Sequence, residues 1–122
     1  MQQNEGSSSR FALVIGAFLL VEGIWGLFSP VVFGVLTTNI LHACIHIVLG
    51  ILGFYTGMKG GARTYSLYLG VLLIAVGIMR FLPVLGDITV SLLNVNQAVA
   101  VFNIVVGVIA VMISRMGAPR SV

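Results

Sequence analysis

Four long apolar runs dominate this 122-residue chain and leave few folds open to it. They cover residues 11–28, 39–57, 65–82 and 95–114. Each is close to the length of about 20 residues that an α-helix needs to cross a bilayer. Only 7% of the residues are charged, against about a quarter in soluble domains. Backbone polar groups in lipid must be satisfied inside the protein, so these runs can only be helices. We therefore predict an all-α integral membrane protein, folded as an antiparallel four-helix bundle.

The residues flanking the runs predict how the bundle is oriented. Residues 1–10 and 115–122 are expected to be short cytoplasmic tails, the first of them disordered because it is polar and low in complexity. Five cations fall on one side of the bundle: Arg10, Lys59, Arg63, Arg115 and Arg120. The other side has only Asp87, with Arg80 just inside the membrane edge. Since cytoplasmic loops carry the excess of Lys and Arg, both termini are predicted to be cytoplasmic.

The two halves of the chain resemble each other. Residues 11–16 align with residues 65–70, and residues 47–50 align with residues 104–107. The matched single residues are Gly23 with Gly77, Asn39 with Asn96, and Ala43 with Ala100. Each half is then a helical hairpin of the same topology, which makes a parallel repeat about an axis along the membrane normal. Such repeats occur in transporters and also in inert bundles, so this one favours a pseudo-symmetric bundle more than it favours transport.

Small and polar residues gather on one face of every run when the residues are placed at helical spacing. Small residues let helix backbones approach closely in lipid, and polar side chains hydrogen-bond across the contact. We expect the four faces to meet one another in the bundle. The residues assigned to this packing are Gly16, Gly23, Gly50, Gly53, Gly57, Gly70, Gly77 and Gly107.

A few ionisable residues lie within the runs. A lone charge at membrane depth costs from about 2.5 to more than 10 kcal/mol, so Glu22 and Arg80 are expected to form a buried ion pair. The histidines or Asn103 would complete their hydrogen bonds. Intramembrane ionisable residues are functional-site hypotheses, while the structural alternative is an ion pair that fixes helix register. Arg80 could instead extend to the outer interface.

His42 and His46 share one helix face because they lie four residues apart. Hydrogen-bonded core histidines are the favoured interpretation. The ligand-binding hypothesis joins His42 and His46 to Glu22 and Asn103, and a haem or chlorophyll-type pigment is a possible but not favoured cofactor. A metal bound by both histidines and Glu22 is conceivable. No metal site is predicted, however, because the residues between the histidines lack the glutamate of a zinc protease motif.

The stretch TNILHACIHIVLG at residues 38–50 carries a family resemblance. It resembles a bacterial four-helix membrane family filed as domain of unknown function four-three-eight-three, whose second helix typically reads N-x-L-H-x-x-x-H-x-x-x-G. Residues 11–16 and 23–28 are similar to its first helix, and the likeness covers about residues 11–113. The resemblance implies a four-span bundle in a bacterial inner membrane and no known reaction. The family often has a histidine in its last helix, where this chain has Val99 and Asn103.

The chain has no motif of a catalytic nucleophile, no phosphate-binding glycine loop and no paired carboxylates, so we predict that it is not an enzyme. Its cations form no patch that indicates nucleic-acid binding. The first functional hypothesis is a non-catalytic structural or accessory subunit that meets lipid and other membrane subunits, or another copy of itself, within the bilayer. The alternatives are a ligand- or pigment-binding protein that uses the histidine face and a small oligomeric transporter or channel.

Overall fold

The computed structural model describes residues 6–116. Within them the elements are α1 (Gly6–Phe28), β1 (Val31–Val32), β2 (Leu36–Thr37), α2 (Ile40–Lys59), α3 (Ala62–Arg80), α4 (Leu85–Leu93) and α5 (Gln97–Met116). Helices α1, α2, α3 and α5 are long and apolar enough to cross a membrane. The prediction of an all-α membrane protein is therefore confirmed.

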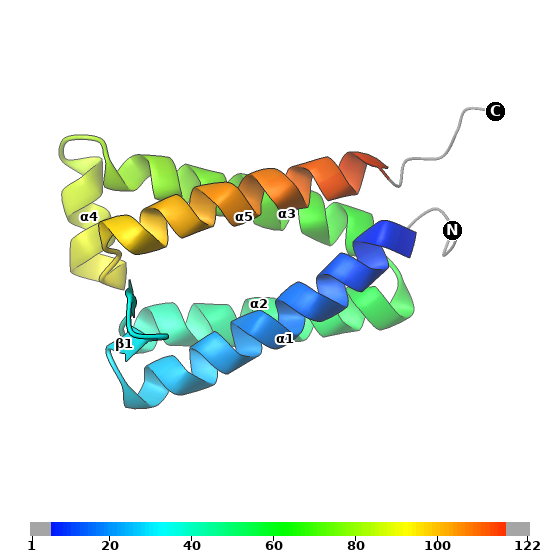
Figure 1. Ribbon diagram of the computed structural model, residues 1–122, viewed down its shortest axis with the longest axis horizontal. Helices are drawn as coiled ribbons and strands as arrows, with labels where there is room; N and C mark the ends of the chain where they lie inside the picture. The colour runs from blue at the N-terminus through cyan, green and yellow to red at the C-terminus, as the bar shows by residue number, and fades with distance from the viewer. Residues whose placement is uncertain (1–5, 117–122) are drawn as a thin grey trace.

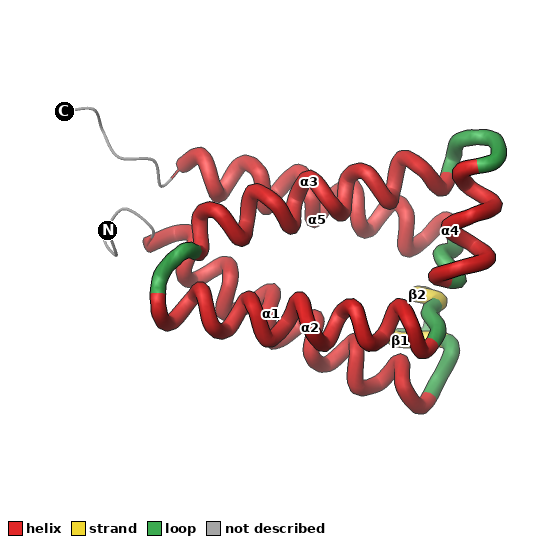
Figure 2. Tube along the Cα trace, turned by 180° about the vertical axis from the view of Figure 1, so that it is seen from behind, coloured by secondary structure: helices red, strands yellow, loops and turns green. Residues whose placement is uncertain are grey.

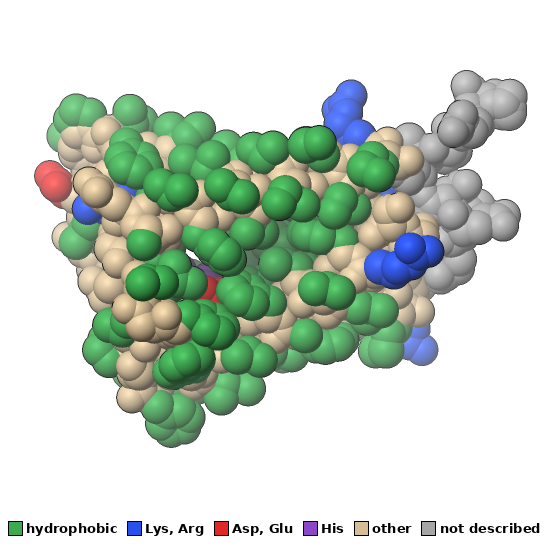
Figure 3. Space-filling model, viewed as in Figure 1, with side chains coloured by type: hydrophobic (Ala, Val, Ile, Leu, Met, Phe, Trp, Pro, Cys, Tyr) green, Lys and Arg blue, Asp and Glu red, His purple; other side chains and the backbone are tan. Residues whose placement is uncertain are grey.

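The four long helices form two hairpins (Figures 1 and 2). Helices α1 and α2 make the first hairpin, α3 and α5 make the second, and each helix makes most of its contacts with the partner in its own hairpin. Helix α4 and the short β1–β2 hairpin lie at one end of the molecule, which we call the α4 end. The start of α1 and the end of α5 lie at the opposite end, which we call the basic end because Arg10, Lys59, Arg63 and Arg115 gather there (Figure 3). Arg120 lies outside the described residues.

Glycine contacts hold each hairpin together, and they recur in both halves. A Cβ atom on Gly16 would lie 2.8 Å from the carbonyl oxygen of Gly50, and one on Gly70 would lie 2.7 Å from that of Gly107. Nearer the α4 end, a Cβ on Gly23 would lie 2.8 Å from Ala43 O. These pairs match the residues that the sequence alignment of the halves equates. Distances this short exclude any side chain larger than hydrogen unless the backbones separate.

The small-residue faces meet in pairs inside each hairpin, and not all four together as the sequence predicted. Gly53 and Gly57 likewise face α1, where added Cβ atoms would lie 2.8 Å from Ala12 O and from Leu13 Cγ. Since close backbone approach uses the small residues of both helices, little of either stripe is left to contact the other hairpin. The two hairpins meet instead through larger side chains, including Ile15 and Leu19 of α1 and Leu69 and Leu73 of α3.

Several boundaries differ from those predicted. Helix α1 begins at Gly6, so residues 6–10 are helical although they were expected in a disordered tail. The Ser8 hydroxyl donates to Ile113 O of α5 at 3.4 Å, which docks this first turn on the second hairpin. Helix α5 continues to Met116. Of the predicted tails, residues 1–5 and 117–122 lie outside the described part of the chain.

Two connecting segments at the α4 end hold structure that the sequence analysis did not predict. Residues 81–96 contain α4, whose Gly86 and Thr89 are buried. Residues 29–38, which we call the strap, contain β1 and β2, paired with Val31 opposite Thr37. Phe33 and Gly34 turn the strap back on itself with φ angles of +55° and +77°. The strap thereby folds over the ends of the helices and does not simply link them.

Candidate functional site

Glu22 of α1 pairs with a histidine. Its Oε1 lies 3.1 Å from Nδ1 of His46 on α2, and each residue is only 7% exposed. The predicted Glu22–Arg80 pair is not formed: the Arg80 Nε donates to Val95 O at 2.8 Å. The reason is that α1 packs on α2 while α3 packs on α5. Each charged side chain therefore finds its partner in its own hairpin or in the segment that leads into it.

His42 connects this pair to the other half of the chain. Its Nδ1 lies 2.9 Å from the carbonyl oxygen of Leu93 at the end of α4. A carbonyl can only accept, so His42 carries a proton on Nδ1, and its Nε2 has a free lone pair when the ring is neutral. The His42 and His46 rings lie edge to face with centroids 4.4 Å apart. Glu22, His46 and His42 thus form one buried set, which we call the polar cluster.

Asparagine side chains position the start of the helix that carries the histidines. Asn39 Oδ1 accepts from His42 N at 2.9 Å, and Asn96 Oδ1 accepts from Val99 N at 2.8 Å. Asparagine is among the preferred residues at this capping position, because its oxygen satisfies a helix N–H that has no partner within the helix. The two aligned asparagines therefore begin α2 and α5 in the same way.

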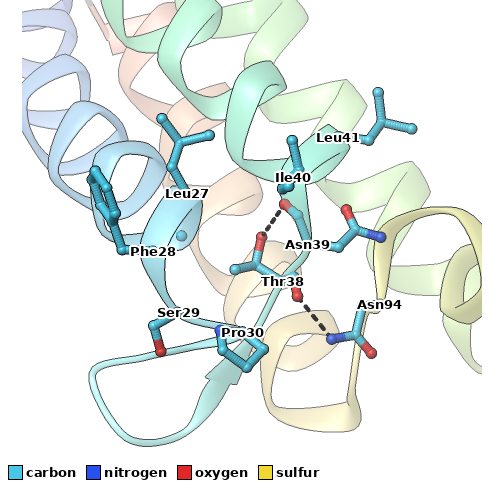
Figure 4. Close-up of a pocket in the computed structure, with 10 residues that line it drawn as sticks. Leu27, Phe28, Ser29, Pro30, Thr38, Asn39, Ile40, Leu41 and Asn94 are labelled. Carbon is cyan, nitrogen blue, oxygen red and sulfur yellow. Dashed lines mark hydrogen bonds between the residues drawn. The ribbon is translucent and has the colours of Figure 1, made fainter.

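The same two asparagines join the halves. Asn39 Nδ2 donates to Leu92 O at 2.8 Å, and Asn96 Nδ2 donates to Val35 O at 3.0 Å. Asn94 adds a bond from Nδ2 to Thr38 O at 2.8 Å (Figure 4). An open pocket of about 670 Å³ lies beside this bond, between the last turn of α1 and the first turn of α2. The amide groups at its edge are already hydrogen-bonded, so the network holds the two hairpins together and offers little to a ligand.

The strap covers the polar cluster. Val32 and Leu36 are almost fully buried and pack on Val95 and Val99 of the second half. The Phe33 ring stacks on Phe18 with centroids 5.5 Å apart and lies 4.9 Å from the ring of Trp25. Behind the strap, the space beside the cluster is a cavity of about 10 Å³. Figure 3 shows acidic and histidine atoms at the bottom of a hollow between hydrophobic side chains.

The size and partners of the polar cluster limit its chemistry. A cavity of about 10 Å³ is near the lower limit for one water molecule, and a haem or chlorophyll ring does not fit. Within residues 6–116, no set of three His, Cys, Asp or Glu side chains is placed to hold a metal ion. The arrangement can pair Glu22 with His46, hold one water, and bond the first hairpin to α4 through His42.

The sequence hypothesis named four ligand-binding residues, and the structure brings three of them together. Asn103 is buried on α5, at the position that the repeat equates with His46, so it belongs to the second hairpin. The strap residues around the cluster were missed, among them Thr37, whose hydroxyl donates to Asn94 O at 2.5 Å. The pair of asparagines at 94 and 96 was the available signal, since asparagines in a short turn favour capping and local hydrogen bonds.

Comparison with known proteins identifies the family to which the chain belongs. No curated protein and no solved structure matches it. The family resemblance noted in the second helix extends over nearly all of the described helices. Residues 9–116 match the family model described as Domain of unknown function (DUF4383), and the chain belongs to that family.

Proposed function

We propose that this membrane protein is a non-catalytic accessory subunit that works by packing against other membrane helices. The observation that carries the proposal is that the polar cluster is buried and paired within the fold. Glu22, His42 and His46 have partners inside the fold, and the cavity beside them is too small for an organic substrate or a pigment. What the spans offer to the bilayer is almost entirely aliphatic and aromatic side chains.

Helix α2 has an outward face that suits such packing. Its members are large apolar residues more than half exposed: Ile40, Leu41, Val48, Ile51, Tyr55 and Met58. Contacts between helices in lipid rest on shape and van der Waals packing, because lipid tails are as apolar as leucine. A face of branched, aromatic and long side chains fits a partner helix of complementary shape. We therefore place recognition within the membrane.

The test is photo-crosslinking in the native membrane. A photoreactive residue at Ile51 should capture one protein in a defined ratio, and mild-detergent purification should recover the same protein. A photoreactive residue at Val101, equally exposed on α5, is the matched control and should capture lipid or a different product. If both positions give only lipid adducts and the protein purifies alone, the accessory role is wrong. The absorption spectrum of the same sample tests the pigment-binding alternative, because a bound pigment would colour it.

A small transporter is the second candidate, and the buried Glu22–His46 pair is the observation that favours it. Ionisable residues at membrane depth mark proton and ion pathways in many transporters. Flux in proteoliposomes that disappears in Glu22→Gln, while the variant stays folded, would favour this function over the accessory role.

We further propose a bacterial inner membrane location with both termini in the cytoplasm. This is supported by the gathering of Arg10, Lys59, Arg63 and Arg115 at one end.

A further inference from the structure

A groove runs between the two hairpins from the basic end toward the middle of the spans. It lies between α2 and α3 and has a volume of about 410 Å³. Its walls are almost entirely carbon, from Leu49 and Leu52 of α2 and from Tyr68 and Leu72 of α3. The Tyr65 hydroxyl, which also lines the groove, donates to Leu49 O at 2.7 Å. The floor of the groove is therefore suited to hydrocarbon and not to a polar ligand.

The dimensions of the groove select its occupant. The distance from Thr56 to Leu49 along α2 is roughly 10 Å at 1.5 Å per residue. A helix with its side chains has a diameter of about 10 Å. An extended acyl chain is much thinner than that, so it can lie lengthwise between the walls that α2 and α3 provide.

The charge at the mouth of the groove selects the headgroup. Lys59 lies three residues beyond Thr56 on α2, on the same face and one turn nearer the membrane surface. It is exposed, as is Thr64 at the start of α3. The two acids of residues 6–116 are both remote from this mouth: Glu22 is buried in the polar cluster and Asp87 lies on α4. Within residues 6–116, the mouth therefore carries positive charge without a nearby carboxylate.

We propose that the α2–α3 groove is a binding site for an anionic phospholipid. One acyl chain lies along Leu49, Leu52 and Leu72, and the phosphate lies beside Lys59. Basic pockets between transmembrane helices attract anionic headgroups, at about 1 kcal/mol per cation near the surface. The site differs from the general lipid shell because it combines a recess of limited width with a cation at its end. It does not depend on the accessory role or on any protein partner.

The test uses nanodiscs of equal parts phosphatidylglycerol and phosphatidylcholine, followed by native mass spectrometry in mild detergent. Wild-type protein should retain one phosphatidylglycerol per chain. Leu52→Trp fills the groove and should abolish retention. Val48→Trp, at an exposed position of α2 that does not line the groove, should leave retention unchanged. If Leu52→Trp fails to fold, a second pair of variants on α3 takes its place. Leu72→Trp then fills the groove, and Val71→Trp is its control.

The headgroup is tested separately by removing one charge. Lys59→Gln should lower the preference for phosphatidylglycerol over phosphatidylcholine about fivefold, the factor that corresponds to about 1 kcal/mol. Arg115→Gln removes the same charge at the same end of the molecule, on α5, and should not change the preference. Equal lipid retention in Leu52→Trp and Val48→Trp, or no headgroup preference in the wild type, overturns the proposal. So does a dimer mass that Leu52→Trp abolishes, because a second chain would then occupy the groove.

Discussion

The two hairpins share their packing and differ in their chemistry. Gly16 meets Gly50 in the first as Gly70 meets Gly107 in the second. At the positions of Glu22 and His46, however, the second hairpin has Val76 and Asn103. Glycine packing is therefore a property of the hairpin as a unit, whereas the polar cluster belongs to one copy only. A residue present in one half alone is a stronger pointer to a specific role than a residue found in both.

The largest expected effect comes from breaking the shared packing. Gly16→Leu and Gly70→Leu should each lower the free energy of unfolding by about 3 kcal/mol or more, because the new side chain meets a backbone carbonyl. Titration with a denaturing detergent, followed by circular dichroism, measures this. Val14→Leu and Val71→Leu, at exposed positions of the same helices, should change it by less than about 0.5 kcal/mol. A large loss in one hairpin only would show that the two contacts are not equivalent.

The next effect tests the difference between the hairpins. Glu22→Val should cost about 1–3 kcal/mol, because it leaves the buried His46 ring without its partner. Adding His46→Asn gives the first hairpin the residues of the second and should recover at least half of that loss. The same unfolding titration measures both variants and their coupling. Without recovery in the double variant, the equivalence of the two sites drawn from the repeat would not hold.

Asparagine substitutions should have smaller and symmetric effects. Asn39→Ala and Asn96→Ala should each cost about 1–2 kcal/mol, since each removes a helix cap and a bond to the other half. Asn39→Asp keeps the capping oxygen but sets a carboxylate oxygen against the Leu92 carbonyl, so it should retain the helix cap and lose the bond between the halves. Hydrogen exchange at the first turns of α2 and α5 shows which helix start is loosened. If either substitution alone lowers the hydrogen-exchange protection of the first turns of both α2 and α5, the two halves are coupled more tightly than these two hydrogen bonds suggest.

Arg80 should have the smallest effect. Arg80→Gln removes one bond to Val95 O from a partly exposed side chain and should cost no more than about 1 kcal/mol. The unfolding titration measures the change in the free energy of unfolding. The double variant Glu22→Gln with Arg80→Gln measures the coupling between the two residues. The two costs should simply add, because the side chains bind different partners. Coupling above about 1 kcal/mol would mean that Glu22 and Arg80 do interact in the membrane.

A structural feature could be predicted from the sequence where the pattern that marks it lies within one helix. The four spans and the glycine faces were predicted because hydropathy and helical spacing are read within one helix. The partner of Glu22 could not be predicted in this way, because Arg80 and His46 both lie near the same end of the spans. Only the tertiary pairing of α1 with α2 decides between them.

The strap and its hydrogen bonds could not be predicted from the sequence for a different reason. Phe33 adopts a positive φ angle that sequence rules assign to glycine or asparagine. The acceptors for Asn39, Asn94 and Asn96 are backbone carbonyls, which every residue has and no sequence pattern marks. The cavity beside the polar cluster depends on both features and so could not be foreseen.

The crossed asparagine bonds have a consequence for how this domain could arise. Asn39 donates to the carbonyl of Leu92, four residues before Asn96, and Asn96 donates to that of Val35, four residues before Asn39. Such reciprocal contacts are those of a two-fold interface between identical subunits. The chain thus has the geometry of a homodimer whose subunits have been joined end to end. In a true homodimer every substitution appears twice, and two buried carboxylates would have to be accommodated. Joining the halves lets Glu22 occur once.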